Sequence, residues 1–169
     1  MSLLTSARNT PFKDSHGIVI PMGVEASTVI YMGALVCSDD NGYAAPAQPK
    51  GSSPFTAVPK VMGVAIRVVD GEFGEDCHNV AGYPMIPSPP NLGSAGALLV
   101  EVRKGVVLLD ISGSTIGQAQ IGSLCYAVDD HTVSNTDATQ TQPVVGMVVA
   151  LESGMVWVDM NVQSLLALP

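Results

Sequence analysis

The sequence contains one local pattern twice, and this repeat limits the folds that the chain can adopt. Each copy has an apolar run with an internal glycine, an acidic pair, a variable loop and a second apolar run with a glycine. The copies are MGALVC (32–37), Asp39-Asp40 and VMGVAI (61–66), and then IGSLCY (121–126), Asp129-Asp130 and VVGMVV (144–149). A strand–turn–strand unit that occurs twice indicates a scaffold of repeated hairpins and no catalytic plan that extends over the whole chain.

The composition is that of a folded domain. The chain has 169 residues, of which 47% are apolar and 13% charged. This length suits one domain, and the composition is too apolar for a disordered chain. No uninterrupted apolar run approaches the roughly 18 to 20 residues of a membrane span, and the N-terminus lacks the apolar core of a signal peptide. We therefore expect a soluble protein that is synthesised in the cytoplasm and has no membrane partner.

The distribution of charge argues against nucleic acid as a partner. The formal net charge is −8, and Arg103-Lys104 is the only adjacent basic pair. Binding to a phosphate backbone depends on clustered lysines and arginines.

The low charge content also bears on oligomerisation. A chain with so few charges favours burial of apolar surface in subunit contacts, and the alternative is a well-filled core under apolar loops.

Short strands with turn signals between them predict an all-β sandwich or barrel of repeated hairpin units, with an extended N-terminal arm and Pro/Gly-rich loops. Asn41-Gly42 is a strong hairpin signal, and Lys104-Gly105 predicts a second hairpin or a bulge. Ile18-Val19-Ile20 predicts one short strand within the arm, and strand signals resume at Val29-Ile30-Tyr31. The predicted layout is an arm (1–28), a single β domain (29–160) with the repeat at about 31–69 and 121–152, a Pro-rich excursion (82–96) and a C-terminal tail (161–169).

Asp129-Asp130-His131 is the cluster that most suggests chemistry, since it could supply a carboxylate-oriented base or metal ligands. Aspartates also cap turns, and the first copy has an acidic pair without a histidine, so we favour the turn interpretation. Cys77-His78 could pair a nucleophile with a base, but adjacent strand residues point to opposite faces. The three cysteines have no CxxC spacing, and the sequence has no nucleophile elbow, phosphate loop or dinucleotide fingerprint. We therefore predict no enzymatic activity, metal or cofactor.

Trp157 lies in an alternating apolar strand near the C-terminus. Tryptophan is enriched at interface hot spots, so Trp157 could anchor a partner, but we favour a place in the core at least equally.

Part of the sequence resembles the capsid cement (decoration) proteins of tailed bacteriophages. The resemblance covers roughly residues 28–160. It is carried by IYMGALV (30–36), DDNGYAAPA (39–47), VMGVA (61–65), GSLCYAVDDHTV (122–133) and VGMV (145–148). It implies a β-rich, non-enzymatic virion protein that binds the outer surface of the phage head where capsid subunits meet. The Pro-rich excursion is not part of the family pattern.

The partners implied by the resemblance are the major capsid protein and further copies of this chain. We favour a homotrimer, with a dimer as the alternative. A phage head-fibre or tail component is the structural alternative, and a small hydrolase or metal-dependent enzyme using Asp129, Asp130 and His131 is the alternative from another class. Contacts with the capsid or between subunits are expected from the arm, the proline-rich loops and the tryptophan. The candidate contact residues are Pro11, Phe12, Ile18, Ile20, Pro54, Phe55, Tyr83, Met85, Ile86 and Trp157.

Overall fold

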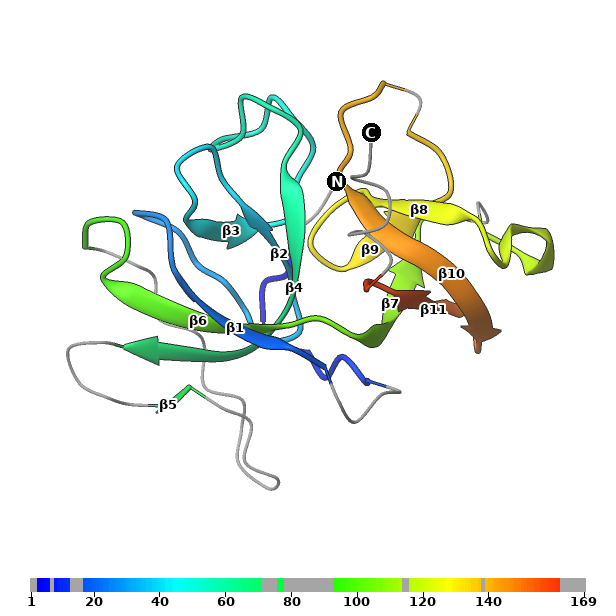
Figure 1. The fold of residues 1–169 in the computed structure, drawn as a ribbon, viewed down its shortest axis with the longest axis horizontal. Helices are drawn as coiled ribbons and strands as arrows, with labels where there is room; N and C mark the ends of the chain where they lie inside the picture. Colours follow the sequence, from blue (N-terminus) through cyan, green and yellow to red (C-terminus); the bar gives the residue numbers. More distant parts are fainter. Residues whose placement is uncertain are drawn as a thin grey trace.

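The computed structural model in Figure 1 confirms the predicted all-β fold, and the described residues form strands and one short 3-10 helix. The structure describes residues 3–6, 8–12, 17–70, 76–77, 93–113, 116–137 and 139–161. In chain order these residues form β1 (Val19–Gly23), β2 (Leu35–Ser38), β3 (Ala44–Pro46), β4 (Lys60–Asp70), β5 (Asp76–Cys77), β6 (Leu98–Arg103), β7 (Val106–Ile111), η1 (Gln118–Gln120), β8 (Leu124–Ala127), β9 (Thr132–Ser134), β10 (Val144–Glu152) and β11 (Met155–Asp159).

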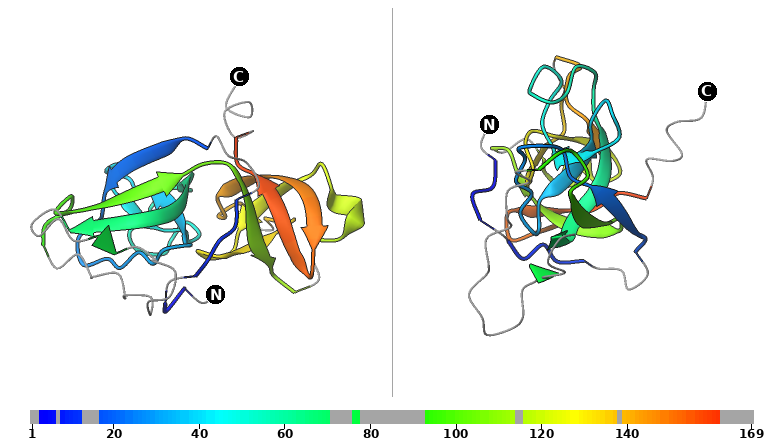
Figure 2. Two further views of the ribbon diagram at one scale, coloured as in Figure 1. Left: turned by 90° about the horizontal axis from the view of Figure 1, so that it is seen from below. Right: turned by 90° about the vertical axis from the view of Figure 1, so that its left-hand side faces the viewer.

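The strands make a six-stranded sheet and a closed barrel, which lie side by side in Figure 2. The sheet has the order β1-β6-β4-β2-β3, and β5 pairs with β4 outside this path. The barrel has the order β10-β11-β7-β9-β8 and is closed by pairing between β8 and β10. We call β1–β4 with β6 the first unit and β7–β11 the second unit.

The two units have the same strand order. Reading outward from the third strand, the first unit runs β3-β2-β4-β6-β1 and the second runs β9-β8-β10-β11-β7. In the second unit β7 and β9 pair in parallel and complete the barrel. In the first unit the corresponding contact is a single parallel bridge between Val24, which follows β1, and Ala44 of β3. The repeat seen in the sequence is therefore part of a duplication that includes all five strands of each unit.

The strand-pairing register of the first unit matches that of the second unit residue by residue. Val36 lies opposite Gly63 in the first unit, Cys125 lies opposite Gly146 in the second, and both pairs are followed by a bulge. On the next strand along, the pair Ala65–Val102 corresponds to Val148–Val158, and again a bulge follows each pair. Bulges at equivalent places bend both sheets in the same way.

The structure shows why glycine occupies each of the repeated positions. Gly33 and Gly122 both have φ +86°, a backbone conformation in which any residue with a side chain would be strained. Gly63 and Gly146 lie where a Cβ atom would overlap a carbonyl oxygen of the next strand, that of Arg103 or that of Asp159. The glycines therefore set a turn and a close strand approach in each unit.

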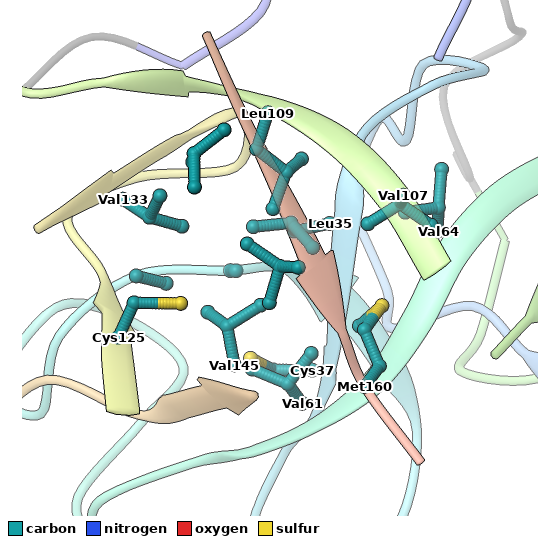
Figure 3. Close-up of a cluster of buried hydrophobic side chains, with 14 of the residues drawn as sticks. Leu35, Cys37, Val61, Val64, Val107, Leu109, Cys125, Val133, Val145 and Met160 are labelled. Atoms are coloured by element: carbon teal, nitrogen blue, oxygen red, sulfur yellow. The ribbon is translucent and has the colours of Figure 1, made fainter. Parts of the chain in front are cut away.

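The core lies in two layers. One cluster of buried side chains fills the first unit and includes Val36, Ala65 and Val102. The other joins the second unit to the opposite face of β2 and β4, and Figure 3 shows Leu35 and Cys37 of β2 among the barrel residues. Because β2 is buried on both faces, all three of its apolar residues have 0% exposure.

Three expectations need correction. Lys104-Gly105 is not a hairpin, because β6 pairs with β1 and β4 whereas β7 pairs with β9 and β11, so the chain crosses here between the units. The short strand predicted at Ile18-Val19-Ile20 is present as β1, an edge strand hydrogen-bonded to β6, so the extended part of the arm is shorter than residues 1–28. Residues 29–31 are not a strand, although Ile30 is buried. The C-terminal tail beyond residue 161 and most of the Pro-rich excursion lie outside the described residues.

Candidate functional site

The described part of the N-terminal arm lies in the seam between the two units (Figure 2). Its backbone bonds to both: Arg8 N donates to Met32 O of the first unit (2.8 Å), and Leu108 N of the second unit donates to Pro11 O (3.1 Å). Phe12 forms an isolated bridge with Val107 of β7. The arm therefore connects the two halves of the molecule, and the residues that hold it form the candidate site.

Side chains fix the arm at several further points. The Arg8 guanidinium donates to both oxygens of Asp110, at 2.7 and 3.4 Å. Thr10 Oγ1 donates to Gly33 O at 2.7 Å and is buried. The guanidinium carbon of Arg103 lies 4.1 Å from the centre of the Phe12 ring, within the range of a cation–π contact.

Asp129 caps the turn between β8 and β9. Its Oδ1 accepts hydrogen bonds from the backbone N–H groups of His131 (3.2 Å) and Thr132 (2.8 Å). In the first unit Asp39 caps the β2–β3 turn in the same way, accepting from Asn41 N (2.9 Å) and Tyr43 N (2.7 Å). The turn interpretation of the acidic residues therefore fits Asp129.

Asp130 does not cap the turn as Asp129 does. The expectation that the two acidic pairs occupy equivalent positions in the repeat is wrong. Asp39 N bonds to Tyr43 O, and the equivalent bond in the second turn is from Val128 N to Thr132 O. Asp39 is therefore equivalent to Val128, and the acidic pairs are offset by one residue. Asp130 corresponds to Asn41, so its carboxylate is not required by the repeated turn.

The carboxylate of Asp130 binds the start of the arm. Both of its oxygens accept from Leu4 N, at 2.9 and 3.1 Å, and Oδ1 lies 2.9 Å from His131 Nδ1. Burial raises the pKa of Asp130, and the hydrogen bonds from His131 and Leu4 oppose this rise. Asp130 thus joins the β8–β9 turn to the arm.

Asp129, Asp130 and His131 could also supply three metal ligands, since their ligand atoms lie within 4.8 Å of one another. In the described structure, however, these atoms already bond to one another, to the turn backbone or to the arm. A cavity of about 280 Å³ beside Asp130 is lined by Leu4, Tyr31 and Pro54 among others. A metal bound there would compete with Leu4 N and His131 for the Asp130 carboxylate.

The two described thiols are poor nucleophiles. Cys37 and Cys125 are free and buried, and burial raises the pKa of Cys125 to about 12 and that of Cys37 further. His78 of the Cys77-His78 dipeptide lies outside the described residues.

The predicted contact residues fall into three groups. Ile18 is 63% exposed, and Pro11, Phe12, Ile20 and Pro54 are half-buried. Phe55 (2% exposed) and Trp157 (6%) are buried, Phe55 as a member of the shared core and Trp157 with Nε1 donating to Glu152 at 2.7 Å. Their predicted contact role does not fit the chain as it stands, because a buried ring offers little surface to a partner. Tyr83, Met85 and Ile86 lie outside the described residues.

Sequence reasoning missed the residues that hold the arm, chiefly Leu4, Arg8, Thr10 and Asp110. One signal was present, because Arg8 is the only charged residue among the first twelve. A lone cation in an extended segment indicates a carboxylate partner, but its position cannot be read from local sequence.

A second carboxyl contact, between Glu25 and Asp39, was also missed. Glu25 follows the bridge that joins β1 to β3, and its backbone N–H donates to Ala44 O at 2.9 Å. A hydrogen bond with the Asp39 carboxyl group raises the pKa of Glu25, and burial raises it further.

Glu25→Gln is expected to raise the Tm at neutral pH and to change it little near about pH 4. Because the folded-state pKa of Glu25 is raised, protonated Glu25 stabilises the fold at acidic pH. This contribution is lost as the pH rises through the folded-state pKa. Glutamine can donate to Asp39 at either pH. Thermal unfolding followed by circular dichroism measures both values, and a lower Tm for the variant at neutral pH would contradict the assignment.

Asp110→Asn is expected to speed tryptic cleavage after Arg8 by about two- to fivefold. The Arg8–Asp110 pair is partly exposed, so its loss weakens the docking of the arm only modestly. The rate is measured by mass spectrometry of the released N-terminal peptide. Asp159→Asn, on β11 of the same unit, is the control, and equal rates for the two variants would show that Asp110 does not hold the arm.

Within the described residues, no helix has the length and apolarity to cross a membrane. No protein-family model, curated protein or solved structure matches the chain.

Proposed function

We propose that this chain is a non-enzymatic structural protein of a bacteriophage virion, a cement protein that binds the outer surface of the head and stabilises contacts between capsomers. Its partners would be the major capsid protein and further copies of itself, with a homotrimer favoured and a dimer as the alternative. It would be synthesised in the cytoplasm of the host bacterium.

The observation that carries the proposal is that the residues able to act as acids, bases or nucleophiles have structural roles. Asp129 caps a turn, Asp130 holds the arm, and the two described thiols are buried in the core. These contacts stabilise a scaffold and leave no group poised as an acid, base or nucleophile among them. The sequence resemblance to cement proteins supports the same role.

The exposed apolar side chains agree with a binding role. Ile18 is 63% exposed, Val19 is 47% and Leu99 is 43%, all on or beside the edge strand β1 and its neighbour β6. Pro21 lies in β1 and has no N–H to offer, which weakens any attempt by another strand to extend this edge. Contacts through side chains are therefore favoured over strand addition.

The test is to mix the purified protein with undecorated shells assembled from the major capsid protein of the same phage. We expect sedimentation with the shells and greater resistance of the decorated shells to heat. Binding that is restricted to the assembled lattice stabilises it by mass action, by about 2.7 kcal/mol per site at roughly 100 times Kd. Absence of binding at micromolar concentration would refute the proposal.

Ile18→Glu should weaken shell binding, and Val58→Glu, at an exposed loop position, is the control. Immunogold labelling of virions separates the alternatives, since label on a fibre or tail would favour that role. For the enzymatic alternative, an activity that His131→Ala removes while the fold is retained would favour a hydrolase or metal-dependent enzyme.

A further inference from the structure

Within the chain, the first unit contacts the second through an apolar face of its sheet, which packs against the apolar mouth of the barrel. The outer face of β2 and β4 contributes Leu35, Cys37, Val61 and Val64, which are between 0% and 3% exposed. We call these four residues the strand face. They share one core cluster with residues at the mouth of the barrel, which Figure 3 labels as Val107, Leu109 and Val145. We call these three residues the barrel mouth.

The second unit carries its own copy of the strand face, and the residues of this copy are not part of the core cluster that the two units share. The registers of the two units make four residues equivalent to the strand face, and all four are apolar or aromatic and half-buried. They are Leu124, Tyr126, Val144 and Met147. Outward-facing positions of a sheet that meets water are normally polar. The retained apolar character indicates a surface that is covered by another molecule.

The first unit carries its own copy of the barrel mouth. The equivalent residues are Ile20, Met22 and Met62, and all three are half-buried, whereas their counterparts in the second unit are 0% exposed. Ile18, which precedes β1 and alternates with Ile20, extends this apolar surface. Each of the two surfaces that pack together in the interior of the chain therefore has a second copy that is only half-buried.

The glycine two residues before the second strand of each unit gives an independent comparison. Gly33 lies against the docked arm, and a Cβ atom there would overlap Arg8 O. Gly122 has the same φ of +86°, but nothing lies within 4 Å of the position of its Cβ atom. The seam that the arm fills between the first and second units thus has an open counterpart at the far side of the second unit.

We propose that copies of this chain associate head to tail, with the second strand face of one copy docked on the first barrel mouth of the next. The contact would repeat the arrangement that already joins the two units within each copy. Such a contact uses different surfaces on its two sides, so it closes into a ring or continues as a chain. A ring of three copies would contain it three times. The inference is independent of capsid binding, because it concerns the free protein in solution.

The test compares the wild type with two full-length variants, each blocked on one side, by sedimentation velocity over a range of concentrations. Met147→Glu places a charge on the second strand face, and Met62→Glu places one at the first barrel mouth. We expect the wild type to form assemblies larger than the monomer. Each variant alone should associate at least about tenfold more weakly. An equimolar mixture of the two should form a one-to-one dimer and nothing larger, because each variant keeps the surface that the other lacks.

Leu99→Glu is the control, since Leu99 is exposed on β6 outside both surfaces, and this variant should associate like the wild type. Circular dichroism and Tm establish that each variant is folded, and Met147→Gln and Met62→Gln replace any that is not. A wild type that stays monomeric at millimolar concentration overturns the proposal. So does a variant that associates like the wild type, or a mixture of folded variants that does not dimerise. Because no capsid is present, these outcomes are distinct from failure of shell binding.

Discussion

Leu35→Ala is expected to lower the free energy of unfolding by about 2 to 5 kcal/mol, the range for truncation of a fully buried leucine. Leu35 is 0% exposed and lies in the core cluster shared by both units. Its removal leaves a cavity where the first unit meets the barrel. Urea denaturation measures the change, with the m-value as a test that the transition stays two-state.

Leu124→Ala is the matched control, because Leu124 occupies the equivalent position in the second unit but is half-buried. Its truncation should lower the free energy of unfolding by about 1 kcal/mol, since less apolar surface returns to water. Equal losses for the two variants would contradict the burial of Leu35 between the units.

Gly33→Ala is expected to destabilise the fold and to release the arm. A side chain at φ +86° costs about 1 to 2 kcal/mol, and the new Cβ atom would also overlap Arg8 O. Displacing the arm removes the hydrogen bonds from Arg8 N to Met32 O and from Thr10 to Gly33 O, each contributing about 0.5 to 1.5 kcal/mol. Hydrogen exchange of residues 8–12 and chemical denaturation report the two effects separately.

Gly122→Ala separates backbone strain from steric overlap with the arm. Gly122 has the same φ as Gly33, but the position of its Cβ atom has open space around it. This variant should show only the backbone contribution, with protection of residues 8–12 unchanged. If both alanine variants lose arm protection equally, the arm is not seated on Gly33.

The sequence predicted the β class and the repeat because both depend on local pattern. Alternating apolar runs and turn residues such as Asn41-Gly42 report strand and hairpin formation directly. The repeated glycines were also visible, since a positive φ or a close strand approach allows little else. The structure adds their reasons, for example the carbonyl of Asp159 against Gly146.

The other features of the fold and of the candidate site depend on contacts between residues that are distant in the sequence. β6 and β11 occupy equivalent places, yet LLVEVR and MVWVD share little beyond alternation, so the extent of the duplication was hidden. Lys104-Gly105 has the local chemistry of a hairpin, but the partners of β6 and β7 lie in different units. The role of Asp130 depends on Leu4, and nothing in the local sequence joins two residues 126 positions apart.

The same separation sets an order of events during synthesis. The arm is translated before the residues that hold it, because Asp110 and Asp130 follow Arg8 and Leu4 by 102 and 126 residues. The seam cannot be sealed until β7 and the β8–β9 turn have been made. A truncated chain that lacks the second unit would keep its arm undocked and the strand face of β2 and β4 exposed to water. Arm closure therefore reports that the second unit has been made, since Asp110 and Asp130 both lie in that unit.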